Sequence, residues 1–310
     1  MYRAASFAEL TKKTYGVHLR SYLQFCNDFG FYPVPATPEQ LSMYAAYLAR
    51  RLKPASVRQY LNVVRLLHLD NGYANPCKDN WHLQATLKGI DRTYGKEVTR
   101  KTPMDPLLLL CIHALLDHSC ILDINFWAAS LVMFYGMFRK SNLMPDTSKG
   151  FVRENQFVRS DFTMDAKYVS VHVKYSKTIQ YKERNYTVKL PVTDTSLCPK
   201  AALLAAFASV TLPKDAPAFV ANGVGQPLTG QSFNRKLKSL LSALGLDQVK
   251  YGSHSFRRGS ATWALSSGIP GEVVKQMGDW RSAVYMDYLD HCHQKVYDHY
   301  VDLFASKLPC

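Results

Sequence analysis

The sequence predicts a mainly α-helical α+β protein with a small antiparallel β-sheet, divided into two domains. Apolar residues recur at helical spacing through the first 95 residues. Between residues 150 and 192 the pattern changes to segments rich in valine, tyrosine and alternating residues, which indicate strands. A polar, basic stretch without periodicity, Gly95 to Pro103, separates the two parts and has the composition of a linker. A chain of 310 residues has room for two domains of ordinary size.

Four helices are predicted in the first part. The first spans Leu10 to Phe29, where aromatic and aliphatic residues alternate with basic ones at helical spacing. The second begins after Thr37, a good capping residue, with Pro38 at the first helical position. The third runs from about Pro54 to Asp70, and the fourth follows Asn80.

Several of these helices, and one later helix, carry basic or amide side chains away from their apolar faces. Such side chains can meet phosphates and base edges in a major groove. A charged helix face is more often only solvated, and the residues alone leave both interpretations open. The candidates for DNA binding are Arg58, Asn62 and Arg65 on the third helix, Lys88 and Arg92 on the fourth, and Arg235 and Lys238 on the later helix.

The second part begins with a leucine-rich helix over Met104 to Asp117. The next helix, Ile121 to Phe138, is apolar nearly all round and should therefore be central. It leads into Arg139, and a charge directly after so apolar a run is costly to bury unpaired. Arg139 is either a snorkelling residue at a helix end or a phosphate ligand projected from the core.

A three-stranded antiparallel sheet is predicted from Phe157-Val158, Tyr168 to Val173 and Tyr186 to Val192. Lys177 lies in the hairpin between the last two strands. Two further helices follow, over Cys198 to Val210 and Gln231 to Leu244.

The composition points to a polyanionic partner. Lys and Arg number 38 against 24 Asp and Glu, a formal net charge of +14, which favours nucleic acid before membrane. A basic protein with a merely solvated surface is the alternative. The longest apolar run, Phe126 to Phe138, is shorter than the roughly 20 residues that a bilayer span needs, and no signal peptide is visible.

The cysteines argue against a disulfide framework and a structural zinc site. There are seven, an odd number, and no C-x-x-C pair occurs. A reducing intracellular compartment is therefore expected. His291, Cys292 and His293 are adjacent and would point in different directions on a helix, so we interpret them as structural and predict no metal.

The stretch from Gly252 to Tyr288 carries the chemistry. Ser253 is a plausible helix cap, and on that helix His254 and Arg257 share one face. They lie in the first turn, where unpaired backbone N–H groups favour an anion. A guanidinium fork beside an imidazole suits a phosphate that gains charge during reaction. The indole of Trp280 and two phenols, Tyr285 and Tyr288, come shortly after. Phosphate ligands followed by an oxygen nucleophile indicate phosphoryl transfer through a covalent tyrosine.

The combination of H-S-F-R, G-D-W-R-S and the following tyrosines resembles the catalytic core of the tyrosine recombinases, the phage-integrase family. It is most similar to the recombinases of eukaryotic DIRS-like and Crypton-like mobile elements. The resemblance implies a helical, SAM-like DNA core-binding domain over residues 1–97 and a catalytic domain over 98–310. It also implies a C-terminal helix within 289–310 that docks onto the next protomer; packing on its own domain is the alternative.

The resemblance also assigns a site. Its residues are Arg139 and Arg257 as phosphate ligands, Lys177 as general acid, His254 as the group that accepts or shares the tyrosine proton, Trp280 as a donor to the phosphate, and Tyr288 as nucleophile. Lys174, Lys182 and Arg184 are the alternatives to Lys177. Tyr288 is eight residues after Trp280, the usual family spacing, while its rival Tyr285 is five after it. Asn142 stands where the family often has a carboxylate.

By this resemblance the protein is a site-specific recombinase that cleaves and rejoins double-stranded DNA through a 3′-phosphotyrosyl intermediate, for integration or excision of a mobile element. It would act as a dimer on one site and a homo-tetramer on two, in the nucleus if its host is a eukaryote. No cofactor, ATP or metal is expected, because phosphotyrosine conserves the bond energy. A domesticated DNA-binding protein without chemistry and a DNA-relaxing enzyme of the type IB topoisomerase kind are the alternatives.

Overall fold

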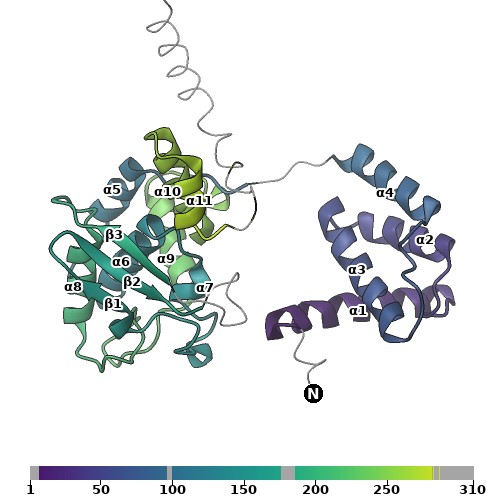
Figure 1. Ribbon diagram of the computed structural model, residues 1–310, viewed down its shortest axis with the longest axis horizontal. Helices are drawn as coiled ribbons and strands as arrows, with labels where there is room; N and C mark the ends of the chain where they lie inside the picture. The colour runs from purple at the N-terminus through teal and green to yellow at the C-terminus, as the bar shows by residue number, and fades with distance from the viewer. Residues whose placement is uncertain (1–6, 96–99, 176–185, 281, 283–285, 287–310) are drawn as a thin grey trace, which may run out of the picture. The chain divides into compact units, whose positions relative to one another are not determined.

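The computed structural model describes residues 7–95, 100–175 and 186–280, together with Ser282 and Met286. The chain divides into two compact units, Met1–Thr99 and Arg100–Cys310 (Figure 1). Each unit has its own core of buried apolar side chains. Every helix within the described residues is too short or too polar to cross a membrane.

The first unit is a bundle of the four predicted helices. They are α1 (Glu9–Phe29), α2 (Pro38–Ala49), α3 (Pro54–Asp70) and α4 (Trp81–Tyr94). The hydroxyl of Thr37 accepts a hydrogen bond from the backbone N–H of Gln40, and Asn80 caps α4 in the same way through Leu83 N–H. The buried face of α3 packs through Val57, Leu61 and Val64, while Tyr22, Phe25 and Tyr44 close the core from α1 and α2.

The second unit combines helices with one small sheet. Its elements are α5 (Pro106–Ala114), α6 (Ile121–Tyr135), α7 (Lys140–Leu143), β1 (Phe162–Met164), β2 (Tyr168–Val173), β3 (Tyr186–Pro191), α8 (Pro199–Ser209), α9 (Gly230–Ala243), α10 (Ser253–Ser266) and α11 (Gly271–Met277), with single 3₁₀ turns η2 (Ser148–Gly150), η3 (Arg159–Asp161) and η4 (Gln248–Lys250).

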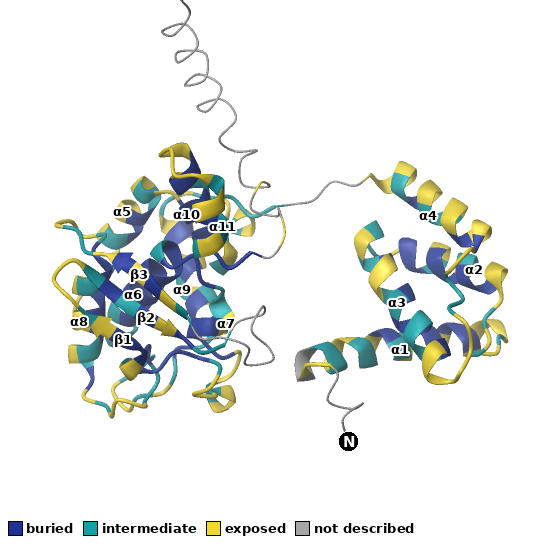
Figure 2. Ribbon diagram, viewed as in Figure 1, coloured by how far each residue is buried: buried dark blue, intermediate teal, exposed yellow. Residues whose placement is uncertain are grey.

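Helix α6 is the centre of this unit, as the apolar pattern predicts. Every residue from Asn125 to Phe134 is buried, and the helix is largely dark blue in Figure 2. It packs against α8 and α10, and Phe126 stacks on Phe233 of α9 with ring centroids 4.6 Å apart. The helix ends at Tyr135 rather than at Phe138, because the chain turns at Met137, whose φ is +49°.

The sheet is antiparallel in the order β1-β2-β3, with Val171 opposite Phe162 on one side and Val188 on the other. The predicted first strand at Phe157-Val158 is wrong, since β1 begins at Phe162. The side chain of Asp161 accepts a hydrogen bond from Val158 N–H at 2.8 Å and closes the η3 turn between the two positions. Residues 157 and 158 therefore precede a turn that sequence alternation alone does not reveal.

Helix α10 begins one residue earlier than the predicted cap requires. Gly252 is the N-cap and Ser253 the first helical residue, so the prediction of Ser253 as cap is wrong. Instead, the hydroxyl of Ser255 accepts a hydrogen bond from Gly252 N–H at 3.1 Å. The segment before α5 lies along this helix, with Met104 N–H donating to the carbonyl of Ser255 at 2.9 Å. Gly259 permits this approach, since a Cβ there would lie 1.7 Å from the Met104 oxygen.

Candidate active site

Arg257 joins the two chain segments that carry Arg139 and Trp280. It lies in α10, is 3% exposed, and donates through Nη1 to the carbonyl of Met137 and through Nη2 to the carbonyl of Gly278. Each acceptor is two residues before a predicted phosphate ligand. The arginine therefore fixes the turn after α6 to the turn after α11, which are 141 positions apart in sequence between Met137 and Gly278.

Trp280 packs beneath this guanidinium. The Cζ atom of Arg257 lies 4.1 Å from the centroid of the indole ring, a cation–π geometry, and Trp280 is 9% exposed. The residue before Trp280, Asp279, has a φ of +51°, and Met137 has a φ of +49°. Positive φ is rare outside glycine and tends to occur at functional sites. Here both residues stand within two positions of a predicted ligand.

Arg139 and His254 line one pocket of about 220 Å³. Arg139 is the N-cap of α7, and His254 is the second residue of α10. The remaining lining consists of Phe138, Lys140, Ser141 and Ser253. The pocket wall thus contains two cations, two hydroxyls and an imidazole, and no acidic side chain is among the described residues that line it. This composition suits an anion, and backbone N–H groups at the start of α10 add to it.

His254 is neutral at physiological pH. Desolvation of the ring and the positive charges of Arg257, Arg258 and Arg139 lower the pKa of His254 from 6.5 to about 4. His254 as a residue is exposed, so the desolvation of its ring is partial. The positive charges of the three neighbouring arginines also lower the pKa of His254. A neutral imidazole can accept a proton, which the predicted role of His254 requires.

The structure adds pocket residues that the sequence interpretation missed. Lys140 and Ser141 follow Arg139 directly, and Ser253 precedes His254, so adjacency to two predicted ligands was the available signal. Lys140 also forms an ion pair with Asp146 at 2.9 Å. Arg258, 3% exposed and beside Arg257, is a further missed contributor to the positive potential at His254.

Asn142 anchors the segment that leads toward Lys177. It is 4% exposed, and its Nδ2 donates to the carbonyl of Tyr175 at 2.7 Å. A carboxylate, which the family often has here, could not make this bond because it has no donor. Lys177, both candidate nucleophiles Tyr285 and Tyr288, and the segment 289–310 lie outside the described residues, as do Lys182 and Arg184. Lys174, another alternative to Lys177, is paired with the buried Asp161 at 2.7 Å.

The predicted DNA-binding residues of the first unit are partly engaged within it. Arg58 forms a two-pronged pair with Asp91 of α4, at 3.0 and 2.7 Å. Asn62 accepts from Arg65 Nε at 3.0 Å and donates to the hydroxyl of Tyr15 at 3.3 Å. The sequence interpretation missed Asp91 as a partner.

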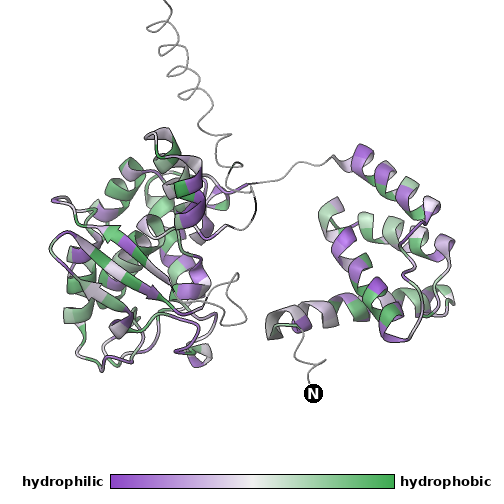
Figure 3. Cartoon of the chain, in the orientation of Figure 1, coloured by the Kyte–Doolittle hydropathy of each residue, from purple (hydrophilic) through white to green (hydrophobic). Residues whose placement is uncertain are grey.

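The other predicted DNA-binding residues are on the surface. Lys88 and Arg92 are exposed on α4, which is hydrophilic over much of its length in Figure 3. Arg235 and Lys238 are exposed on α9, three positions apart and thus on one face. All four are therefore accessible to a phosphate backbone.

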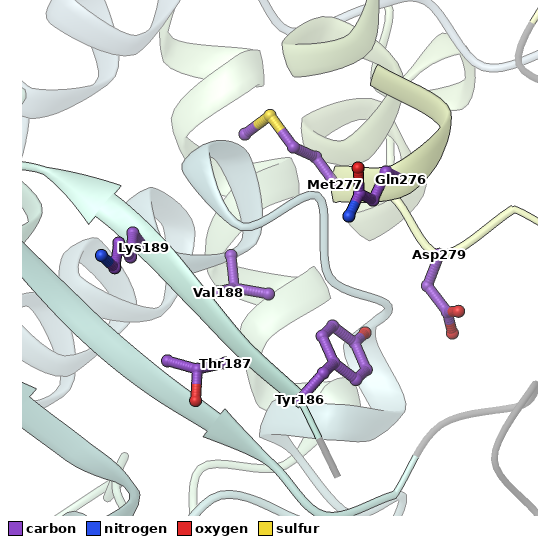
Figure 4. Close-up of a pocket in the computed structure, with 7 residues that line it drawn as sticks. All are labelled: Tyr186, Thr187, Val188, Lys189, Gln276, Met277 and Asp279. Carbon is purple, nitrogen blue, oxygen red and sulfur yellow. The ribbon is translucent and has the colours of Figure 1, made fainter. Parts of the chain in front are cut away.

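A second pocket of about 370 Å³ lies beside the edge strand of the sheet (Figure 4). The side chains of β3 line one side of it, and the other side is lined by Gln276 and Met277 at the end of α11 and by Asp279 just after it. It contains none of the predicted catalytic residues that the structure describes. The smaller pocket is therefore the candidate site, since two predicted catalytic residues, Arg139 and His254, line it.

The chain was compared with protein families, with curated proteins and with solved structures. No family model matches the chain. The chain is 24% identical over 277 residues to an integrase/recombinase described as a xerD homolog of Selenomonas ruminantium, covering 87% of this chain and 77% of the relative.

Solved structures agree in fold. XerH site-specific recombinase in a post-cleavage complex with palindromic difH substrate superposes with a TM-score of 0.67 at 15% identity, over 94% of this chain and 79% of that one. The Tn1549 transposon integrase with transposon right-end DNA gives 0.66 at 12% identity, over 93% and 90%. A lambda integrase dimer bound to a COC′ core site gives 0.62 at 16% identity, over 91% and 89%. The chain is thus similar in sequence to an integrase/recombinase, and it shares the fold of these solved recombinase and integrase structures.

Proposed function

We propose that the chain is a site-specific DNA recombinase, a DNA strand-transferase that cuts and rejoins duplex DNA through a phosphotyrosyl intermediate. The observation that supports this most is the convergence of Arg139 and His254 on one pocket, with Arg257 joining their surroundings to Trp280. These residues come from two distant parts of the sequence, the turn at Arg139 and the stretch that begins at Gly252. Stability alone does not require a buried arginine and an indole beside an anion-favouring pocket.

The chemistry begins with a phosphate diester in the Arg139–His254 pocket. Arg139 and Arg257 stabilise the charge that develops on the non-bridging oxygens, and the indole N–H of Trp280 adds a donor. The phenol oxygen of Tyr288 attacks phosphorus, and the bond from phosphorus to the 5′-oxygen breaks. His254 accepts the phenol proton, since its ring is neutral.

Lys177 donates a proton to the leaving 5′-oxygen, so a free 5′-hydroxyl and a 3′-phosphotyrosine result. Attack of a second 5′-hydroxyl on that phosphotyrosine reverses the sequence and joins a new strand. No net bond energy is lost in either step.

The first unit, with the linker, supplies a second set of contacts to the duplex. We expect Arg58, Asn62, Arg65, Lys88 and Arg92 to contribute there, and Arg235 and Lys238 on α9 of the catalytic unit. Because recombination exchanges strands between two duplexes, we expect four protomers on two sites. The C-terminal segment is a candidate link between neighbouring protomers. Integration or excision of a mobile element, in the nucleus of a eukaryotic host, is the setting we propose.

The test is selection of bound duplex DNA with the whole chain, followed by covalent trapping on a nicked version of the selected site. A protein–DNA adduct that survives denaturation supports the proposal. Tight binding without any adduct would favour a DNA-binding protein that has lost the chemistry. Relaxation of supercoiled plasmid irrespective of sequence would favour the topoisomerase-like alternative.

A further inference from the structure

Lys140 occupies an unusual position at the mouth of the candidate site. Its side chain lines the pocket with Arg139 and His254. The aliphatic stem lies directly over Gly230, the first residue of α9, where a Cβ would come within 2.6 Å of Lys140 Cδ and 2.7 Å of Nζ. The Lys140 side chain therefore packs over Gly230, which leaves room for it because glycine has no Cβ.

The ammonium is paired with a weakly held partner. Lys140 Nζ lies 2.9 Å from an Oδ1 of Asp146, and the two side chains are 30% and 74% exposed. An exposed ion pair contributes little, because water solvates both charges nearly as well. Asp146 is not among the residues that line the pocket.

An anion bound in the pocket meets more positive groups and hydrogen-bond donors than the carboxylate of Asp146 meets outside it. Arg139 and the start of α10 add positive potential, and Ser141 and Ser253 bring hydroxyl donors. A lysine is a compact charge on a flexible stem, so its ammonium can turn while its stem stays over Gly230. A DNA phosphate entering the pocket meets two cationic side chains, Arg139 and Lys140.

We propose that Lys140 is a phosphate ligand of this site and that Asp146 is its resident counterion, which the DNA backbone displaces on binding. The inference rests on the proposed function in requiring DNA as the ligand of this pocket. Asp146 thereby weakens DNA binding, because it competes with the phosphate for the ammonium of Lys140. The contact between Lys140 and the phosphate contributes to the dependence of DNA affinity on salt concentration.

The experiment uses the full chain with Tyr288→Phe, so that binding is measured without cleavage, and a duplex selected by the wild-type protein. Lys140→Met keeps the stem over Gly230 and removes only the charge. Affinity should fall about fivefold or more, and the slope of log affinity against log salt should become shallower by about 1. Asp146→Asn should raise affinity by about two- to fivefold, the range an exposed ion pair spans.

The double variant separates a specific exchange from a general change of charge. With Lys140→Met in place, Asp146→Asn should have no effect on affinity, because no ammonium remains to be released. Lys214→Ala, an exposed lysine outside the pocket lining, is the matched control for loss of one positive charge and should leave the salt slope unchanged.

Two results would overturn the inference. One is a salt slope that Lys140→Met leaves unaltered, and the other is a gain from Asp146→Asn that persists in the double variant. Either can occur while the wild-type protein still forms its covalent adduct, in which case the proposed function stands and only the role of Lys140 falls. Failure of the wild-type protein to select or bind any duplex would remove both.

Discussion

The guanidinium of Arg257 lies 4.1 Å above the indole centroid of Trp280, and the same guanidinium donates to the carbonyls of Met137 and Gly278. One buried side chain thus holds together the two turns that present Arg139 and Trp280. Arg257 therefore positions the segments that carry Arg139 and Trp280. Sequence spacing alone identifies Arg257 only as a phosphate ligand.

Substitutions of Trp280 should separate its packing role from its donor role. Trp280→Phe keeps a ring beneath Arg257 but removes the indole N–H. We expect the unfolding free energy to fall by only about 1 kcal/mol, while cleavage slows by about 100-fold, as for loss of one donor to a developing charge. Trp280→Ala should cost about 3–5 kcal/mol of stability. Urea unfolding and the rate of adduct formation measure the two effects. Equal losses of stability in both variants would contradict this separation.

The pH dependence of folding should reflect His254. Its folded pKa lies below its unfolded value, so between pH 6.5 and about 4 the unfolded chain binds a proton that the folded chain does not. Stability contributed by the neutral ring is therefore present above pH 6.5 and declines as the pH falls through this window. His254→Gln should flatten that decline. Unfolding midpoints across the window, with ring titration by NMR, measure it.

The arginines around the ring supply the control for this pH effect. In Arg139→Gln, one of the three positive charges is gone, so the pKa of His254 should rise. A ring that titrates near 6.5 in the unmodified protein would show that the arginines do not act on it.

Gly259→Ala should disrupt the contact between α10 and the segment before α5. The new Cβ would lie 1.7 Å from the Met104 carbonyl oxygen, and a backbone atom cannot move aside as a flexible side chain can. We expect a loss of about 3 kcal/mol or more, the upper end for overpacked cores. Gly89→Ala is the matched control, because that helical glycine has no atom within 4 Å of the Cβ position. It should gain roughly 0.5–1 kcal/mol. Chemical unfolding of both variants distinguishes the two cases, and similar effects would contradict the account.

Asn142→Asp should be harmful although the family resemblance by itself would favour a carboxylate at this position. The Nδ2 donor to Tyr175 would be replaced by an oxygen facing a carbonyl in a buried setting. The expected cost is about 1–3 kcal/mol, that of a buried acceptor left without its donor. Unfolding in urea checks this, with Asn142→Ala as the comparison. An aspartate variant as stable as the natural protein would show that the bond does not matter.

Local signals in the sequence were strong enough to place most elements. Pro54 at a helix start gave the bounds of α3, and the apolar run after Ile121 indicated the buried helix α6. The first strand was misplaced because the decisive interaction, Asp161 with Val158 N–H, is a side-chain bond within a turn. Such bonds leave no periodic signature.

Partners that come from distant parts of the chain were not predictable. Arg58 appeared as a DNA contact, but nothing local indicates its pairing with Asp91, 33 positions away. Likewise, Lys140 and Ser253 enter one pocket only because α7 and the start of α10 meet in the fold. Sequence spacing identified the ligand types, while the pocket wall depends on tertiary packing.

The central claim is that Tyr288 attacks a phosphate held at the Arg139–His254 pocket, and covalent trapping on a nicked suicide substrate tests it most directly. The natural protein and Tyr285→Phe should both form an adduct that survives denaturation, while Tyr288→Phe should form none and still bind the same DNA. Trapping retained in Tyr288→Phe, or lost in Tyr285→Phe alone, would contradict the account.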